Sequence, residues 1–522
     1  MPFTSLLATR FNRAINWASH NRYLLLVCFL LLQVLAFSLQ GIWVEDFWEH
    51  SAAVSEFMRH PLSPSHPQLN LSAPHTFLNP YTFLVALTAL ALGLNSITAL
   101  SIFGVLNFCL FCWGLSAFIS SHYPIKDDAY KVSFYSLLFI LFLWGGQPWP
   151  YSGFFSYQIF LFNLPYPSTF IGGLSLLTLG LIKRRQTQLG LIQWLALLLI
   201  TSLSLLTHAL TAQFLVIGLV APALTAQQNN FTQLLKIGLL CVAAVALACL
   251  WPFYPFLALL RGAGTVYDIS NLTMYFHFFE RVWPFILLSP LIAWVLLQRN
   301  YRVLLFIFGA TAMIYLFGFY SHKYSYGRIV SYTVMIAQIC CAIAVVQLES
   351  WLTQNRPRVR LTYQALLLSL LIFLSMDWLF ASTTRLLTAA NSVRLGRPIF
   401  NQISYKDYRS VSVHIPVGSL VFANLDASWV LPSFGAKVVA ALHPLAFVQD
   451  AAQRVEHTTL FFAEDTPPSA RLDLLKKYHA DYLLIDKKVD HNWNTIRLQL
   501  SELNQRTTLF EDERFVLITL KN

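Results

Sequence analysis

The stretch YLLLVCFLLLQVLAFSLQ-GIWVEDFWEH, residues 23–50, joins eighteen uncharged residues to a short acidic and aromatic segment. A helix over 23–40 is long enough to cross the hydrocarbon core of a bilayer. No small-residue cleavage pattern follows it, so we interpret it as an uncleaved first span. The next ten residues carry Glu45, Asp46, Glu49 and His50. These polar side chains are therefore expected to emerge at the membrane surface.

The composition supports a polytopic membrane protein. Of the 522 residues, 56% are apolar and only 11% are charged, and the mean hydropathy is +0.57. Water-soluble globular domains carry about a quarter charged residues. The seven cysteines all lie in apolar segments, so none is placed to cross-link an exported loop. The fold class expected is a bundle of membrane-spanning helices.

Eleven segments are candidate spans: 23–40, 97–120, 132–147, 168–182, 189–207, 209–226, 237–255, 282–298, 303–320, 329–348 and 364–382. Basic residues between spans stay on the cytoplasmic side. With a cytoplasmic N-terminus, fourteen Lys and Arg of the membrane domain fall on that side and five on the other. We therefore expect a multi-pass protein of the inner (plasma) membrane, with everything after residue 382 on its periplasmic or extracellular side.

The apolar segment 79–95 is expected to lie in the membrane interface, because counting it as a span would reverse every later loop. It begins at Pro80, a favoured first position of a helix. The first outer loop, 41–96, then holds two helices, 45–60 and 79–95, joined by the proline-rich connector HPLSPSHPQLNLSAPH.

On the helix 45–60, Asp46, Glu49 and His50 share one face because residues three and four positions apart are neighbours. One interpretation is an amphipathic helix anchored by Trp43 and Trp48 with its charges in water. The other is a catalytic acid cluster held at the membrane surface. Glu56 lies further along the helix. The substitution Glu56→Gln is expected to cost almost no activity.

This organisation resembles the GT-C class of integral-membrane glycosyltransferases, such as protein O-mannosyltransferases and lipid A aminoarabinose transferases. Those enzymes have a cytoplasmic N-terminus and a first outer loop that opens with an acidic pair and holds two interfacial helices. Here the pair is Glu45 and Asp46, and FLNPYTFLVAL, residues 77–87, stands at the start of the second helix. The resemblance covers residues 1–382. It departs from the O-mannosyltransferase pattern in having one proline, Pro80, where those enzymes have two.

The resemblance implies an inverting transfer of a sugar from a polyprenyl-phosphate donor to a glycan, lipid or protein acceptor in the cell envelope. A carboxylate must take the proton of the acceptor hydroxyl as general base. Asp46 is the expected base and Glu45 the alternative, with Glu49 and His50 beside them. The donor is the lipid-linked sugar, and a divalent cation is compatible with such a site, although no metal ligand is predicted.

Cations are needed where charge develops on the departing phosphate. The segment SHKYSYGRIV, 321–330, offers Lys323 and Arg328 for the lipid phosphate and Tyr324 and Tyr326 for the substrate. Interface residues that reach toward water explain the same cluster without a ligand. His208, in SLLTHALTAQF, is expected where the fifth span turns into the sixth. It is a phosphate-contacting candidate or, equally, a structural histidine.

The segment 383–522 is expected to form an exported soluble α/β domain, since its 16 basic residues nearly balance its 14 acids. Apolar runs at 419, 437, 481 and 514 alternate with helical stretches 450–462, 469–480 and 493–504, which predicts a layered sheet. His443 is its candidate substrate-binding residue. Surface pairing explains the stretch around it equally well.

Other classes of protein remain open on the sequence alone. A transporter or lipid flippase would show internal repeats and charges near the bilayer midplane, and neither is found. A non-catalytic membrane scaffold is a second alternative, and it would need only the exported domain to bind its partners. O-antigen polymerases and ligases use a large outer loop between late spans, which this chain lacks. Nothing indicates a nucleic-acid partner, because the net charge of +11 is accounted for by loops facing anionic lipid.

Overall fold

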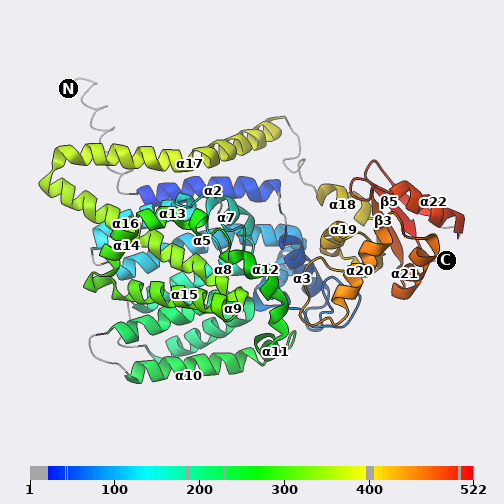
Figure 1. Ribbon diagram of the computed structural model, residues 1–522, viewed down its shortest axis with the longest axis horizontal. Coiled ribbons are helices and arrows are strands. Elements are labelled where there is room, and N and C mark those ends of the chain that lie inside the picture. Colours follow the sequence, from blue (N-terminus) through cyan, green and yellow to red (C-terminus); the bar gives the residue numbers. More distant parts are fainter. Residues whose placement is uncertain are drawn as a thin grey trace. The chain divides into compact units, whose positions relative to one another are not determined.

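The computed structural model describes residues 21–41, 43, 45–123, 125–146, 148–183, 189–226, 231–395, 405–503 and 507–520. They fall into two compact units. The helical unit comprises residues up to Ser38, Gly104–Ala248 and Asp268–Leu395, and the mixed unit comprises Leu39–Phe103, Cys249–Tyr267 and Gly396–Asn522. Figure 1 shows the long helices of the first and the sheet of the second. The mixed unit thus joins the predicted outer loop, 41–96, to most of the predicted exported segment, 383–522.

Long and short helices build the helical unit: α2 (Arg22–Gln40), α5 (Ser96–His122), α6 (Lys126–Phe142), α7 (Tyr157–Asn163), α8 (Pro167–Lys183), α9 (Leu191–Thr225), α10 (Phe231–Ala248), α12 (Asp268–Asn271), α13 (Phe278–Leu287), α14 (Ser289–Leu296), α15 (Arg302–Tyr320), α16 (Val330–Asn355) and α17 (Pro357–Arg394). Short 3₁₀ turns η2 (Leu272–Tyr275), η3 (Arg299–Tyr301) and η4 (Tyr324–Ile329) connect some of them. Small residues bring α5 and α8 close together, as expected of apolar helices. A Cβ on Gly114 would lie 2.5 Å from the carbonyl oxygen of Gly173.

Six helical segments among the described residues are long and apolar enough to cross a membrane: α2, α5, α9, α10, η3 with α15, and η4 with α16. The pair α13 and α14, bent by 65°, raises the number to seven if it is one broken span. The number of spans expected from the sequence, eleven, is therefore not confirmed. Two predicted spans form the single helix α9, which leaves helical geometry at His208. Two others form helices α6 and α8 of 17 residues each.

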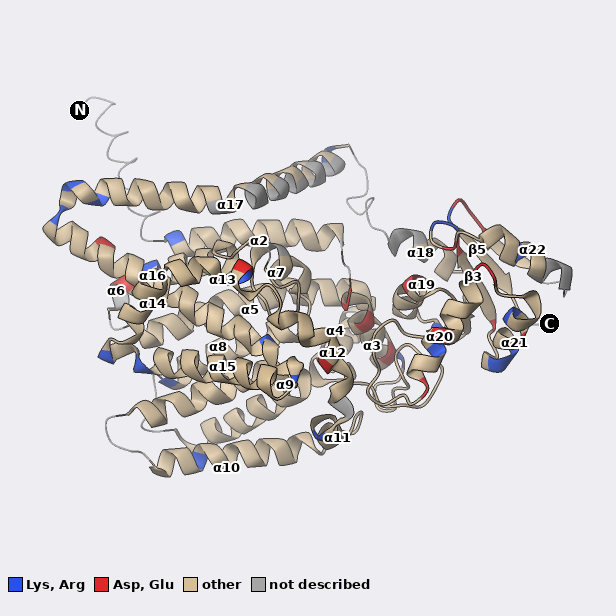
Figure 2. Cartoon of the chain, viewed as in Figure 1, with Lys and Arg blue, Asp and Glu red and all other residues tan. Residues whose placement is uncertain are grey.

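Charge is unevenly distributed over the helical unit. In Figure 2 most of the Lys and Arg residues of this unit gather at one end of its helices. This distribution follows the loops that the sequence analysis grouped on one side, and it is the pattern expected when one end of a bundle faces the cytoplasm.

The mixed unit begins with the two helices expected in the outer loop, α3 (Phe47–Arg59) and α4 (Pro80–Leu92). Local sequence explains the limits of α4. The side chain of Asn79 accepts from the backbone of Thr82, the Thr82 side chain accepts in return, and Pro80 occupies the first turn, which together form a capping box. Gly93 ends the helix at a φ of 65°, a conformation that glycine adopts without steric cost.

The C-terminal part of the mixed unit is a five-stranded sheet in the order β2-β1-β3-β5-β4. Its strands are β1 (Leu420–Phe422), β2 (Lys437–Val438), β3 (Tyr482–Asp486), β4 (Thr508–Glu511) and β5 (Phe515–Thr519). β1 is parallel to β2 and β3, whereas β5 is antiparallel to β3 and β4. The four predicted apolar runs form β1, β2, β3 and β5. The sequence analysis missed β4, whose mostly exposed residues give no apolar signal.

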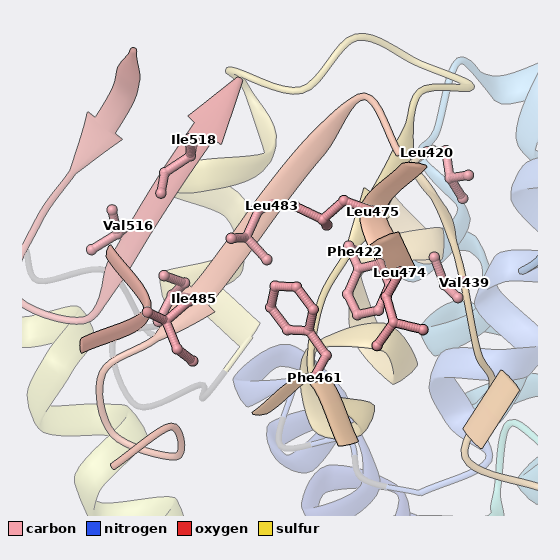
Figure 3. Close-up of a cluster of buried hydrophobic side chains, with 11 residues drawn as sticks. Leu420, Phe422, Val439, Phe461, Leu474, Leu475, Leu483, Ile485, Val516 and Ile518 are labelled. Carbon is pink, nitrogen blue, oxygen red and sulfur yellow. The ribbon is translucent and has the colours of Figure 1, made fainter. Parts of the chain in front are cut away.

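Helices accompany the sheet: α18 (Tyr405–Ser412), α19 (Leu425–Val430), α20 (Ala451–Phe462), α21 (Pro468–Tyr478), α22 (Trp493–Leu503) and the turn η5 (Leu431–Phe434). The three helical stretches expected after residue 450 correspond to α20, α21 and α22. Figure 3 shows the apolar core that these elements share, in which Phe422 and Leu483 from the sheet meet Phe461 of α20 and Leu475 of α21.

Segments from the two ends of the chain form the mixed unit together. Leu69, in the proline-rich connector, forms a parallel bridge with Val438 of β2. The hydroxyl of Ser433 in η5 donates to the carbonyl oxygen of Trp48 in α3. Of the two interpretations of this helix, the one that leaves its charges in water does not describe Glu49, His50 and Glu56, which are all buried. Residues beyond 404 contribute to the burial of Glu49 and Glu56.

Candidate active site

The acidic cluster begins where the chain enters α3. Glu45 has a φ of 56°, in the left-handed region that costs energy for residues other than glycine. Asp46 occupies the N-cap position, but its side chain caps no backbone N–H. The carboxylate therefore remains available for other contacts, although capping is the usual role of aspartate there. Glu49 follows one turn later on the same face.

His443 joins this cluster from the loop after β2. Its Nδ1 atom lies 2.9 Å from Oε1 of Glu49 and 3.4 Å from Oδ1 of Asp46. The predicted substrate-binding histidine and two predicted catalytic acids are thus brought together. The side chain of Glu49 is 4% exposed and that of Asp46 33% exposed. Asp46 is therefore the member of the pair that an incoming substrate can reach.

The charged groups of the cluster shift one another's pKa values. Burial alone would lower the pKa of His443, but the contact with Glu49 and the charges of Asp46 and Glu45 raise it to about 9. Burial raises the pKa of Glu49, although His443 opposes the shift. Burial and the charge of Asp46 also raise the pKa of Glu45. A protonated imidazole at neutral pH is what allows the carboxylates to stay ionised so close together.

Further polar groups surround the cluster, and sequence reasoning missed them. The buried side chain of Gln68, in the connector, lies beside Glu49, and its hydrogen bond favours the ionised carboxylate. The charge of Glu49 also reaches the phenol of Tyr267, whose pKa is raised mainly by burial. Trp429 packs edge-on against the ring of His443, with ring centroids 5.1 Å apart. No local signal marks these residues, because only the fold brings them to α3.

His50, the fourth predicted member, is buried, and its ring packs 4.3 Å from that of Phe77. Glu56 has partners that the sequence analysis did not predict. It forms an ion pair with Lys437 at 2.9 Å and with Arg59 at 2.8 Å, and it accepts from the hydroxyl of Ser65. Burial opposes ionisation, but Lys437 and Ser65 hold the pKa of Glu56 below its usual value. Glu56 therefore has a structural role that the sequence analysis did not predict, while the expectation that Glu56→Gln costs almost no activity stays a prediction.

The donor set of the cluster fits a cation. Asp46, Glu49 and His443 each offer one ligand atom, and these atoms lie within 4.8 Å of one another. Two carboxylate oxygens with one imidazole nitrogen suit borderline divalent ions such as Mn²⁺ or Zn²⁺. The sequence analysis predicted no metal ligand, since a histidine so distant in sequence forms no recognisable spacing with the acids.

The cationic candidates lie in the helical unit. Arg328 donates from Nε to Oδ1 of Asn271 at 2.7 Å and from Nη1 to the hydroxyl of Ser152 at 2.9 Å. Its guanidinium also lies 5.3 Å from the ring centre of Tyr151. These two bonds orient the guanidinium.

The other cationic and aromatic candidates have different surroundings. Lys323 has an exposed side chain, which fits a residue reaching into water. Tyr324 interacts through its hydroxyl with Nδ1 of His322, and the ring of Tyr326 packs against Phe317. His208 lies at the break in α9, where its Nδ1 atom forms a hydrogen bond with the hydroxyl of Thr211. Its ring is also close enough to Arg328 for the charge of Arg328 to act on it. Among these residues, His208 and Arg328 are neighbours.

Comparison with solved structures finds the same fold at low sequence identity. ArnT from Cupriavidus metallidurans bound to undecaprenyl phosphate matches with a TM-score of 0.52 and 10% identity, over 95% of this chain and 98% of that one. The apo oligosaccharyltransferase of Archaeoglobus fulgidus matches with a TM-score of 0.50 and 12% identity, over 92% and 72%. The chain has the GT-C fold. A second form of the archaeal enzyme, tethered to an acceptor peptide containing the NVT sequon, matches with a TM-score of 0.50 and 12% identity, over 93% and 71%.

The GT-C resemblance drawn from the first outer loop is therefore confirmed at the level of the fold. No family model and no curated protein matches the sequence. The spatial arrangement of helices and sheet thus carries the relationship.

Proposed function

We propose that this GT-C protein is an inverting glycosyltransferase that moves a sugar from a polyprenyl-phosphate donor to an acceptor hydroxyl at the outer face of the membrane. The cluster of Asp46, Glu49 and His443 carries the proposal, because it places a reachable carboxylate beside a second acid and a histidine. The fold supports it, since one structure that shares it holds undecaprenyl phosphate. The acceptor is a glycan, lipid or protein of the cell envelope.

Asp46 acts as the general base in this mechanism. Its carboxylate takes the proton of the acceptor hydroxyl while the acceptor oxygen bonds to the anomeric carbon. The bond from that carbon to the phosphate oxygen breaks at the same time, and polyprenyl phosphate leaves. A single displacement of this kind inverts the anomeric configuration. His443 and Glu49 are positioning residues, because their contacts fix the carboxylate and balance its charge.

Arg328 is assigned to the phosphate of the lipid donor, with His208 beside it. The guanidinium is already oriented by Asn271 and Ser152, so little reorganisation is needed when negative charge develops on a departing phosphate. A divalent cation bound by Asp46, Glu49 and His443 would displace the imidazolium proton and supply positive charge in its place. The membrane topology proposed is a cytoplasmic N-terminus with the mixed unit on the opposite side.

Substitution of the base tests the proposal most directly. Asp46→Asn keeps the shape of the side chain and removes its basic oxygen. We expect the release of undecaprenyl phosphate from a panel of synthetic undecaprenyl-phosphate sugars to slow by about 10²- to 10⁴-fold. Folding is checked by thermal unfolding, and Asp465→Asn, an exposed aspartate of the mixed unit, is the control.

The outcomes separate two assignments. If Asp46→Asn retains the wild-type rate and Glu45→Gln is inactive, the base is Glu45, one position earlier on the strained turn. If both variants retain the wild-type rate, the cluster is not catalytic and the proposed function fails.

The phosphate assignment is tested by binding. Arg328→Gln should weaken the affinity for undecaprenyl phosphate by about tenfold or more, because hydrogen bonds to charged groups contribute roughly 1.5 to 3 kcal/mol. Lys323→Gln should have a smaller effect, since an exposed ammonium makes a less directional contact. Filter binding of tritiated undecaprenyl phosphate measures both variants. Equal affinity in Arg328→Gln and the wild type, with both folded, would remove Arg328 from the site.

A further inference from the structure

The mixed unit contains a cavity that the proposed transfer reaction does not use. Its volume is about 420 Å³, within the range of pockets for small ligands. Its lining comes from three segments: the start of α19 around Asp426, the end of α20 from Thr458 to Glu464, and the loop after β3 around Asp490. All three belong to the C-terminal part of the chain.

The sheet topology explains why a cavity forms here. β1 and β3 are parallel neighbours, and from their carboxyl ends the chain leaves in opposite directions, toward β2 after β1 and toward β5 and β4 after β3. Such a switch point opens a crevice beyond the carboxyl ends of the strands, where open α/β sheets bind ligands. Residues 424–426 and 489–492, which follow β1 and β3, line this crevice.

The chemistry of the lining excludes an anionic ligand. Asp426, Glu464 and Asp490 supply three carboxyl groups, and no Lys or Arg is among the residues that line the cavity. Burial raises the pKa of Asp490 to about 6, and the charges of nearby aspartates add to this shift. Phosphate groups, and therefore nucleotides, would be repelled.

The carboxyl groups are also not arranged for a metal ion. Among the described residues, the group of acidic and histidine ligand atoms that converge closely enough for a cation is Asp46, Glu49 and His443. Asp490 is already engaged, because its two oxygens accept from Asn424 and from the backbone of Asp486. A ligand of this cavity must therefore be extended and meet polar groups that are spread around it.

Two observations point to a ligand with hydroxyl groups. The hydroxyl of Thr458 is without a hydrogen-bond partner although the residue is only 1% exposed, and a buried hydroxyl without a partner costs free energy. The half-buried ring of Phe462 offers an apolar face in the same cavity. Pockets of this kind combine an apolar surface with a few polar groups that fix the orientation of a ligand.

We propose that the cavity between Asp426, Thr458 and Asp490 binds an uncharged sugar residue of a glycan. The carboxyl groups and the threonine accept from and donate to its hydroxyl groups, and Phe462 packs against its apolar face. The proposal goes beyond the transfer reaction, because this site needs neither the base nor the lipid donor.

The cavity can be tested with glucose and glucuronate, which share a ring and differ by a carboxylate. Binding is measured by saturation-transfer difference NMR on the full chain in lipid nanodiscs, because the headgroup of a maltoside detergent would compete. Glucose should bind and glucuronate should not. Thr459→Trp fills the cavity from the exposed side of α20 and should weaken glucose binding by about tenfold or more.

Two controls make the result specific. Gln453→Trp places the same bulk at an exposed position of α20 outside the cavity and should bind glucose like the wild type. Asp46→Asn should also bind glucose normally, which separates this site from the proposed base. Glucose binding that survives Thr459→Trp, glucuronate binding equal to that of glucose, or no binding of glucose at millimolar concentration would each overturn the proposal.

Discussion

At the scale of single residues, His443 has the largest electrostatic consequence. It is the only histidine of the described residues that forms ion pairs with two carboxylates, Asp46 and Glu49. Its pKa of about 9 keeps the imidazole charged at neutral pH. The cost of holding acids close together at the start of α3 is thereby reduced.

The pH dependence of stability tests this view of His443. Its pKa is raised from 6.5 to about 9 in the folded protein, so its stabilising contribution is complete below pH 6.5 and is lost as the pH rises through 9. The unfolding temperature of His443→Gln should therefore fall furthest below that of the wild type at pH 6 and converge with it above pH 9. Differential scanning fluorimetry measures this, with His60→Gln, an exposed histidine, as control. A difference independent of pH would show that His443 stabilises by packing alone.

At the scale of elements, α3 is held against the sheet by buried polar contacts as well as by packing. The ammonium of Lys437, at the start of β2, donates to Glu56, to Ser65 and to the carbonyl oxygen of His66. Glu56 lies on the helix that carries Asp46 and Glu49. The ion pair therefore helps to fix the position of α3 relative to β2, together with the bonds from Ser433 to Trp48 and from Arg59 to Gly435.

Breaking that pair should destabilise the protein strongly. Lys437→Met leaves Glu56 buried beside Arg59 as its remaining cation, and removal of one partner of a buried pair costs about 3 to 5 kcal/mol. The double variant Lys437→Met/Glu56→Leu should lose less than the sum of the single variants. Thermal unfolding in nanodiscs measures the series. Glu511→Gln, which breaks the more exposed pair with Lys487, is the control and should change stability by about 1 kcal/mol or less. Additive losses in the double variant would mean that the two residues act independently.

At the scale of the whole molecule, the orientation in the membrane follows from the distribution of basic residues (Figure 2). Loops rich in Lys and Arg stay in the cytoplasm, and Arg299 and Arg302 flank such a loop between α14 and α15. The proposed topology puts the first outer loop, which carries the proposed base, and the segment after residue 382 on the other side.

Accessibility of single cysteines tests this orientation in intact cells. The seven native cysteines are first replaced, since Cys28, Cys109 and Cys249 are exposed. Leu62→Cys and Ser469→Cys, both at exposed positions of the mixed unit, should react with a membrane-impermeant maleimide. Asn300→Cys, exposed in η3, should react only after the cells are opened. The reverse pattern would place the proposed base in the cytoplasm and exclude an outer-face reaction.

The sequence by itself determined the elements whose signals are local. Asn79, Pro80 and Gly93 specify the limits of α4 through capping and backbone preference, and short apolar runs specify four of the five strands. The acidic residues at the start of α3 are visible in the same way. Each of these features depends on residues a few positions apart, where the backbone period and the side-chain type suffice.

Only the tertiary structure decided which of these residues meet. The sequence left open whether the acids of this helix lie in water or form a cluster, and it placed His443 in a separate domain. The fold buries Glu49 and Glu56 and brings His443 to the first and Lys437 to the second. Nothing in the neighbourhood of either residue encodes the contact. It arises because the sheet that contains β2 packs against α3, and packing of segments from opposite ends of the chain is decided by the burial of the whole unit and not by any local pattern.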